Sequence, residues 1–313
     1  MNDVIFGVSF MARTELIDCI IALDDYDVEK AAALREHLRV PGMGDTAARF
    51  FRDKLAMRTQ AQAAGIAVPD FIHVLNYDRL REFLARVPPP YVLKPRLQAG
   101  AIGIKKIENA DQFWQMVEQL GDQQSFYLLE RFVAGKVYHA DSILYEGEVL
   151  LSVVHEYGTP PLEVAQQGRV FSTRTMLRGS VEERDLQLFN RVVLGAMGLQ
   201  QGVSHTEFLK SKEDGKFYFL ETSARVGGAN IVELVEASTG LNLWREWAKI
   251  ETSGANEYKL PPAKKDYAGL LISLAKNEWP DLSSYNAPEV VWRMQKRHHA
   301  GLILGSPSFE RVD

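Results

Sequence analysis

Two short apolar runs that each carry one carboxylate decide the fold: GVSHTEFL at residues 202–209 and FYFLETSAR at residues 217–225. The polar stretch between them contains Asp214 followed by glycine, a pair typical of hairpin turns, which predicts two antiparallel strands. If the turn pivots on Asp214, Glu207 faces Glu221, because side chains alternate along a strand and opposite residues share a face. A pivot one residue away makes them a diagonal or split pair.

Two opposed carboxylates on a half-buried surface repel each other, so the pair needs a cation or a shared proton to compensate. Oxygen ligands suit a hard divalent cation, most simply Mg²⁺. Arg225 and the pair Gly227-Gly228 follow directly. We therefore favour a metal site over the alternative, in which both glutamates lie on the solvated face of an ordinary sheet.

The bulk composition excludes several classes of protein. The chain has 313 residues and a net charge of −5, so it has no general attraction to nucleic acid or to anionic membranes, and we expect neither as a partner. Residues 1–15 do not resemble a signal peptide, and no apolar run is long enough to span a bilayer. A single cysteine, Cys19, lies in the apolar run 19–23 and is predicted to be a core residue, which suits a reducing, cytoplasmic compartment.

Helical and strand-like segments alternate along the chain, which predicts a mixed α+β fold. Besides the hairpin, strands are expected near residues 20–23, 68–74, 91–94, 126–132, 137–145, 148–157 and 170–176. Helices are expected near residues 28–38, 46–64, 78–87, 111–120, 182–197, 231–239 and 243–250. Pro160-Pro161 predicts a loop, and the stretch 259–265 predicts a linker into a small terminal unit.

A candidate phosphate site follows the predicted strand that ends at Lys94. The small-residue loop that comes next contains Gly100 and Gly103, and such a loop lets backbone N–H groups approach an anion while the lysine supplies charge. It lacks the Walker spacing, and taken alone it is equally typical of an ordinary turn. Lys54, on a predicted helix, would by itself be interpreted as part of a solvated face.

The strand at 126–132 ends its apolar run in Glu130, followed by Phe132 and Val133. The carboxylate could accept a hydrogen bond from an exocyclic amine, and the backbone beyond it could contact an adenine edge. The alternative, Glu130 paired with Arg131 or solvent, is equally compatible with the residues. The histidines lack zinc-type spacing, and no nucleophile elbow or Gly-x-Gly-x-x-Gly motif is present.

Taken in order, these segments resemble an ATP-grasp enzyme over roughly residues 45–252. The resemblance rests on Lys54, VLKP at 92–95, GAIG at 100–103, LERF at 129–132, Glu207 and ETSAR at 221–225. It implies an ATP-grasp fold at residues 45–258, in which two α+β subdomains, about 68–133 and 134–258, clasp a nucleotide. Residues 1–44 would then be the remnant of an N-terminal α/β domain, and residues 259–313 a small C-terminal unit.

The resemblance also implies roles for individual residues. Lys54, Lys94, Gly100 and Gly103 would hold the ATP phosphates; Glu130, Phe132 and Val133 would bind adenine; Glu207, Glu221 and Ser223 would bind Mg²⁺. Arg225 and Lys94 would be the catalytic residues, with Arg225 gripping a carboxylate or an acyl phosphate. The loop 98–104 would close over the site as a lid.

Three departures from the family pattern are visible. Ser223 replaces the usual Asn of a Glu-x-Asn metal triplet, so a second ion would be held less tightly or through water. Val137 stands where relatives carry a ribose-binding Glu, and Asp141 or His139 is a candidate substitute. The N-terminal domain is short and the chain ends early, so we expect it to be a fragment.

The segments RVGGANI at 225–231 and TGLNL at 239–243 are most similar to the carboxylate–amine ligase branch. The resemblance therefore implies an ATP- and Mg²⁺-dependent ligase that activates a small-molecule carboxylate as an acyl phosphate for capture by an amine. It is also compatible with a homodimer. The alternatives are a bicarbonate-activating, biotin carboxylase-like enzyme and a non-catalytic or truncated ATP-binding protein.

Overall fold

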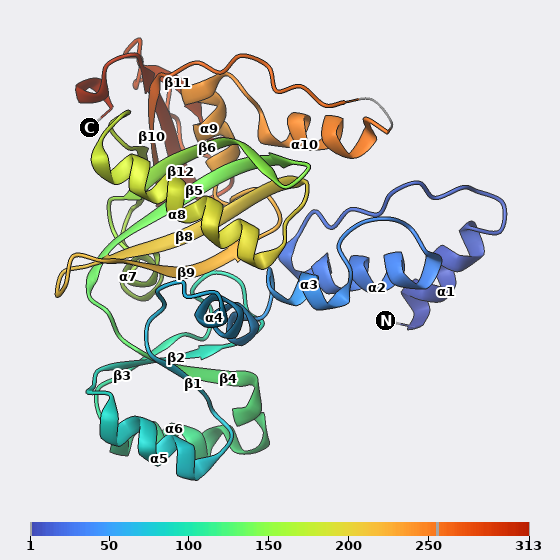
Figure 1. Cartoon of the computed structure of the whole chain (residues 1–313). Coiled ribbons are helices and arrows are strands. Elements are labelled where there is room, and N and C mark those ends of the chain that lie inside the picture. The colour runs from blue at the N-terminus through green and yellow to red at the C-terminus, as the bar shows by residue number, and fades with distance from the viewer. Residues whose placement is uncertain (1, 255–256, 313) are drawn as a thin grey trace.

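Two antiparallel β-sheets of unequal size organise the computed structural model, which describes residues 2–254 and 257–312 (Figure 1). The smaller sheet contains, in spatial order, β1 (Phe71–His73), β4 (Tyr127–Arg131), β2 (Tyr91–Pro95) and β3 (Lys105–Ile107). The helices α5 (Tyr77–Arg86) and α6 (Ala110–Leu120) cover the side of this sheet that points away from the larger sheet. β3 was not predicted, because three residues are too short for a periodic signal.

The larger sheet has eight strands in the order β11-β12-β10-β7-β6-β5-β8-β9. Their bounds are β5 (Gly135–Tyr145), β6 (Glu148–Tyr157), β7 (Phe171–Thr175), β8 (Gly202–Ser211), β9 (Phe217–Ser223), β10 (Tyr267–Leu274), β11 (Val290–Arg293) and β12 (His299–Ser306). Because β10 pairs with β7, the C-terminal strands continue this sheet. The predicted boundary at residue 259 stays a prediction.

Side chains alternate between the two faces of the larger sheet, and each face packs against different helices. On one face Tyr138, Ala140 and Phe208 join a core with α4 (Lys54–Ala63) and α8 (Val181–Met197). On the other face Ile143 and Val203 pack against α9 (Ile231–Thr239) and α10 (Leu243–Thr252). Glu207 and Glu221 of the candidate site belong to this second face.

The N-terminal segment is helical, with α1 (Asn2–Met11), α2 (Val28–Leu38) and α3 (Asp45–Arg49). The strand predicted at 20–23 is wrong: these residues have no regular secondary structure, although Ala22 packs with Ala31 and Ala32. Residues 2–70 form no strand that could pair with it, and an unpaired strand leaves its backbone groups unsatisfied. Without that strand Cys19 is exposed, so its predicted place in the core is also wrong.

Two further segments differ from the prediction. The helix expected at 46–64 is divided, because Asp53 starts a new helix by accepting a hydrogen bond from the Leu55 N–H. Where Pro160-Pro161 predicted a loop, a short helix α7 (Pro161–Gln167) begins with proline in its first turn. In the described part of the chain, no helix combines the length and apolar character needed to cross a membrane.

Candidate nucleotide and metal site

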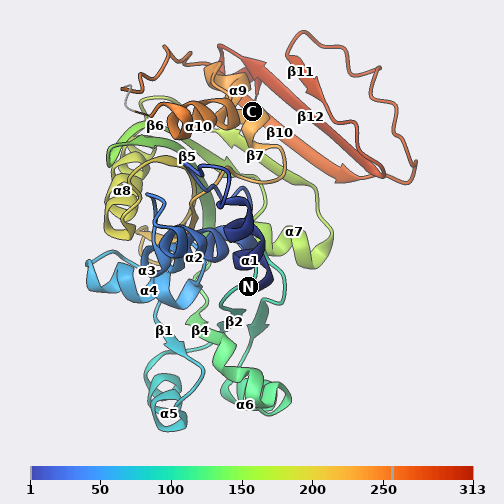
Figure 2. The same ribbon diagram turned by 90° about the vertical axis from the view of Figure 1, so that its right-hand side faces the viewer.

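A cavity of about 460 Å³ is lined by residues of the smaller sheet, the larger sheet and α7. Figure 2 shows α7 at the level between the two sheets. Its lining includes eight of the predicted site residues: Lys54, Lys94, Gly100, Glu130, Phe132, Val133, Glu207 and Glu221. A second hollow of about 380 Å³, lined by residues 64–67 with Phe189, Val192 and Phe217, contains no charged side chain. The larger cavity is thus the one whose lining combines charge with a size suited to a small molecule.

The acidic hairpin folds as predicted, with Glu207 of β8 opposite Glu221 of β9. A regular ladder continued from the turn would instead place Leu220 opposite Glu207, because Phe208 pairs with Phe219 and Lys210 with Phe217. The register shifts by one residue at this point, as it does at a β-bulge. The bulge therefore brings the two carboxylates face to face.

Lys54 lies against this acid pair. It is the first residue of α4, and its ammonium lies 2.8 Å from Glu221 Oε2 and donates to the Gln98 carbonyl at 2.7 Å. Although burial opposes it, Lys54 lowers the pKa of Glu221, with smaller contributions from Lys94 and Arg58. Lys54 thus joins the acidic hairpin to the predicted phosphate loop.

Lys94 is held by Glu130 rather than facing the cavity alone. The Lys94 ammonium donates to Glu130 at 2.6 Å, and the Arg58 guanidinium lies 2.8 Å from the same carboxylate. Glu130 is only 1% exposed, and burial alone would raise its pKa, but Arg58 and Lys94 lower it. Its side chain therefore orients Lys94, while its contact with adenine stays a prediction.

Arg58 contacts the candidate site and was not found by sequence analysis. It is fully buried, and besides Glu130 it contacts the carbonyl of Leu220, the residue at the bulge. The available signal was its spacing, since Arg58 lies one helical turn after Lys54 and shares its face.

Tyr157 is a second missed residue. Its hydroxyl donates a hydrogen bond to Glu207 Oε1 at 2.8 Å. Burial, and then the charge of Glu207, raises the pKa of Tyr157 well above its ordinary value, so the hydroxyl stays protonated and can donate. In the sequence, Tyr157 is an aromatic residue at the end of a predicted strand, and nothing there indicates a hydrogen bond to Glu207.

The remaining predicted residues lie outside the cavity lining. Arg225 forms an ion pair with Asp25 and donates to the Val226 carbonyl at 2.7 Å, so its substrate role stays a prediction. Ser223 pairs with His205 across the hairpin. At Gly103, with φ +73°, an added Cβ would lie 2.9 Å from Pro95 Cγ, so this glycine is needed for the loop to pack on β2.

The suggested ribose ligands are not in the cavity. His139 and Asp141 are fully buried and contact each other, with 2.7 Å between His139 Nδ1 and Asp141 Oδ2, so neither can reach a ribose. Polar side chains of α7, Glu163, Gln166 and Gln167, line the cavity instead.

The arrangement can hold an anion and a hard cation side by side. Lys54 and Lys94 supply positive charge, and Glu207 and Glu221 supply carboxylate oxygens, the donor type that Mg²⁺ prefers. Tyr157 contacts Oε1 of Glu207, and Lys54 contacts Oε2 of Glu221. The second oxygen of each carboxylate is left to bind a cation.

Comparison with known families matches residues 87–233 to the ATP-grasp domain. The L-arginine-specific L-amino acid ligase of Bacillus subtilis is 22% identical over 233 residues, which cover 72% of this chain and 56% of that protein. The chain thus spans about half the length of this curated relative.

Solved structures share the fold. An L-amino acid ligase from Bacillus licheniformis superposes with a TM-score of 0.76 at 20% identity, covering 98% of this chain and 79% of the other. A biotin carboxylase from Campylobacter jejuni gives a TM-score of 0.68 at 15% identity, covering 97% and 73% of the two chains.

Proposed function

Because this chain contains an ATP-grasp domain and has the ATP-grasp fold, we propose that it is an ATP- and Mg²⁺-dependent carboxylate–amine ligase. A substrate carboxylate oxygen attacks the γ-phosphorus of ATP, which gives an acyl phosphate and ADP. An unprotonated amine then attacks the acyl carbon, and inorganic phosphate leaves. The observation that carries the proposal is the single cavity in which Lys54 and Lys94 lie beside the opposed Glu207 and Glu221.

Lys54 and Lys94 neutralise the triphosphate. Phosphoryl transfer depends mainly on positioning and on charge stabilisation, so fixed cations next to the phosphates are the largest contribution that side chains can make. Glu130, which also contacts Arg58, holds Lys94 in place. The loop 98–104 contributes backbone N–H groups, and its contact with Lys54 through the Gln98 carbonyl links its position to the phosphate site.

Glu207 and Glu221 would hold the metal, with Ser223 as a further candidate ligand. Magnesium, when bound there, would neutralise charge on the phosphoryl group during transfer. Tyr157 fixes the orientation of Glu207 by its hydrogen bond, and the bulge at Leu220 fixes Glu221 opposite.

Arg225 binds the substrate carboxylate. A guanidinium is always charged and can donate two parallel hydrogen bonds to a carboxylate. Its present partner, Asp25, comes from the N-terminal segment, so that segment also borders the substrate site. Amino acids are the first carboxylates to test, because two of the similar proteins, from Bacillus subtilis and Bacillus licheniformis, are amino-acid ligases.

Trapping with hydroxylamine tests the reaction class. The full chain is incubated with ATP, Mg²⁺, hydroxylamine and a panel of amino acids and other small acids, with Glu221→Gln as the inactive control. Formation of a hydroxamate together with ADP, absent in the control, is the expected result. Nucleotide binding without any hydroxamate across the panel would contradict the proposal and support a non-catalytic ATP-binding protein.

A bicarbonate-activating enzyme is the second candidate, favoured by the structural similarity to biotin carboxylase. Cleavage of ATP that requires bicarbonate and biotin, with no hydroxamate from amino acids, would support it instead.

A further inference from the structure

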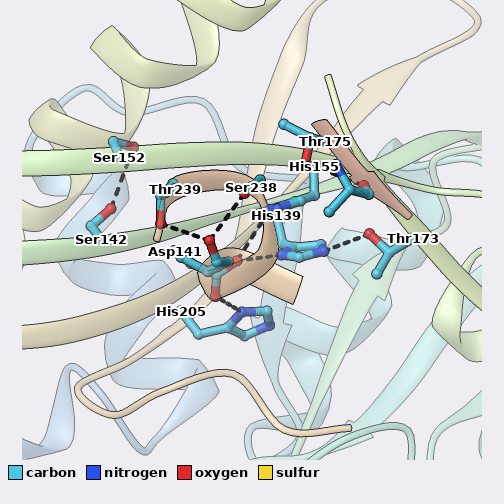
Figure 3. A network of polar contacts seen from close by, with 12 residues as sticks. His139, Asp141, Ser142, Ser152, His155, Thr173, Thr175, His205, Ser238 and Thr239 are labelled. Atoms are coloured by element: carbon cyan, nitrogen blue, oxygen red, sulfur yellow. Dashed lines mark hydrogen bonds and ion pairs between the residues drawn. The ribbon is translucent and has the colours of Figure 1, made fainter. Parts of the chain in front are cut away.

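The acid pair belongs to a row of polar side chains that crosses the larger sheet. Strand pairing aligns Glu221, Glu207, His139, His155 and Thr175 on five neighbouring strands. The adjacent row places Asp141 opposite His205. Because side chains alternate with a period of two, both rows point to the same face of the sheet. Figure 3 shows Asp141 between His139 and His205.

The core of this cluster is a carboxylate between two imidazoles. Asp141 Oδ2 lies 2.7 Å from His139 Nδ1, and Asp141 Oδ1 lies 2.9 Å from His205 Nδ1. His139 and Asp141 are 0% exposed and His205 is 9% exposed. One ligand atom from each of the three residues can be chosen so that all lie within 4.8 Å of one another.

We infer that His139, Asp141 and His205 form a binding site for a divalent transition metal, most simply Zn²⁺. Two imidazole nitrogens and the two oxygens of one carboxylate provide four donor atoms of the types that zinc uses in proteins. The present nitrogen-to-oxygen spacings are those of hydrogen bonds, and an ion between the donors needs them to widen by a few tenths of an ångström. Neither the proposed ligase reaction nor the acid pair uses this site.

The outer nitrogen of His139 supports the assignment, because it lies 2.7 Å from the Thr173 hydroxyl. His205 Nε2 lies 3.7 Å from Glu207 Oε1, beyond hydrogen-bond distance. When Nδ1 binds a metal, Nε2 carries the proton and needs an acceptor. A metal-bound histidine typically donates its other N–H to an oxygen in this way.

His155 is a separate observation that points to the same place. It is fully buried, and neither of its nitrogens forms a good hydrogen bond among the described residues, although Nδ1 lies 3.3 Å from Asp141 Oδ2. A buried polar group without a partner is costly. His155 therefore adds imidazole nitrogens next to Asp141 that have no hydrogen-bond partner among the described residues.

The backbone at Gly227 packs against the donor atoms of the site. A Cβ added to Gly227 would lie 2.9 Å from His205 Nδ1 and 3.0 Å from Asp141 Oδ1. The backbone that follows Arg225 therefore passes directly over the donor atoms and leaves no room for a substrate. A closed site of this kind is structural rather than catalytic.

Metal binding by the full chain tests the inference without ATP or a substrate. Protein stripped by a chelator is titrated with Zn²⁺ alone by calorimetry, and with Co²⁺, whose visible spectrum reports tetrahedral coordination by nitrogen and oxygen. We expect one tight site per chain. The double variant His139→Gln/His205→Gln should weaken Zn²⁺ binding by at least about 100-fold, whereas His37→Gln should not change it.

A matched variant separates this site from the acid pair. Glu221→Gln should keep the tight Zn²⁺ site and the Co²⁺ spectrum, because it removes no donor of the cluster. Loss of the site in Glu221→Gln, unchanged binding in the double histidine variant, or no tight Zn²⁺ or Co²⁺ binding by the folded wild-type chain would each overturn the inference. If the double variant does not fold, the wild-type Co²⁺ spectrum and the Glu221→Gln titration decide.

Discussion

Glu207 lies opposite Glu221 because the ladder between β8 and β9 shifts by one residue at Leu220. The turn alone would pair Glu207 with Leu220, whose apolar side chain cannot bind a cation. Arg58 contacts the Leu220 carbonyl and the buried carboxylate of Glu130, so one side chain links the bulge to the smaller sheet. The geometry of the candidate metal site thus depends on a buried residue outside the cavity lining.

Replacing Arg58 by methionine should lower the free energy of unfolding by about 3–5 kcal/mol, because it leaves a buried carboxylate with one cation fewer. The matched control is Arg81→Met, which removes an exposed ion pair with Asp78 and should cost less than about 1 kcal/mol. Urea unfolding of both variants measures the difference. Equal losses would show that Arg58 has no special structural role.

Tyr157→Phe should raise the Mg²⁺ concentration needed for half-maximal activity roughly tenfold, because it removes a hydrogen bond to the charged Glu207 that contributes about 1.5–3 kcal/mol. The KM for ATP at saturating Mg²⁺ should change much less. Tyr145→Phe, on the neighbouring strand, serves as the control. A parallel rise of both constants would indicate general damage to the site instead of a displaced metal ligand.

Glu130→Gln should change how stability depends on pH. The pKa of Glu130 in the folded protein lies below its ordinary value of 4.5, so the unfolded chain binds its proton first as the pH falls. This carboxylate therefore stabilises the fold above about pH 4.5, and the contribution is lost as the pH falls through the lower, folded-state value.

The glutamine variant should be less stable than wild type near neutral pH, and the difference should shrink in acid. Urea unfolding across the pH range measures both curves. A difference that stays constant down to the lowest pH at which both proteins fold would refute the assigned charge on Glu130.

Lys54→Met should weaken binding of a non-hydrolysable ATP analogue by at least about tenfold, since it removes a cation from the proposed phosphate site. Lys30→Met is the control, because Lys30 pairs with Asp27 on the surface of α2. Calorimetry measures both affinities. Equal affinities for the two variants would exclude Lys54 from the phosphate site.

The sequence predicted those features that rest on periodicity and local turn chemistry. Alternation and the Asp214-Gly215 pair predicted the hairpin, an assumed pivot on Asp214 predicted Glu207 opposite Glu221, and the order of motifs identified the fold. The prediction assumed a turn centred on Asp214, whereas the structure reaches the same pairing through a bulge. A bulge has no periodic signature, so this mechanism could not be seen in the sequence.

Features that depend on distant contacts were not predictable. The apolar run 20–23 resembles a strand locally, but it finds no partner strand in the described N-terminal segment. The contacts of Arg58 with Glu130 and of Tyr157 with Glu207 join residues that are far apart along the chain. The histidines lack zinc-type spacing in the sequence, and only strand pairing shows that His139 and His205 both contact Asp141.

The most direct test of the magnesium assignment is the Mg²⁺ dependence of nucleotide binding. Calorimetry compares the affinity for a non-hydrolysable ATP analogue with and without Mg²⁺, in the wild-type chain and in Glu221→Gln. The account predicts that Mg²⁺ tightens binding to the wild-type chain by at least about tenfold and that Glu221→Gln loses this gain while remaining folded. The same Mg²⁺-dependent gain in both proteins would contradict it.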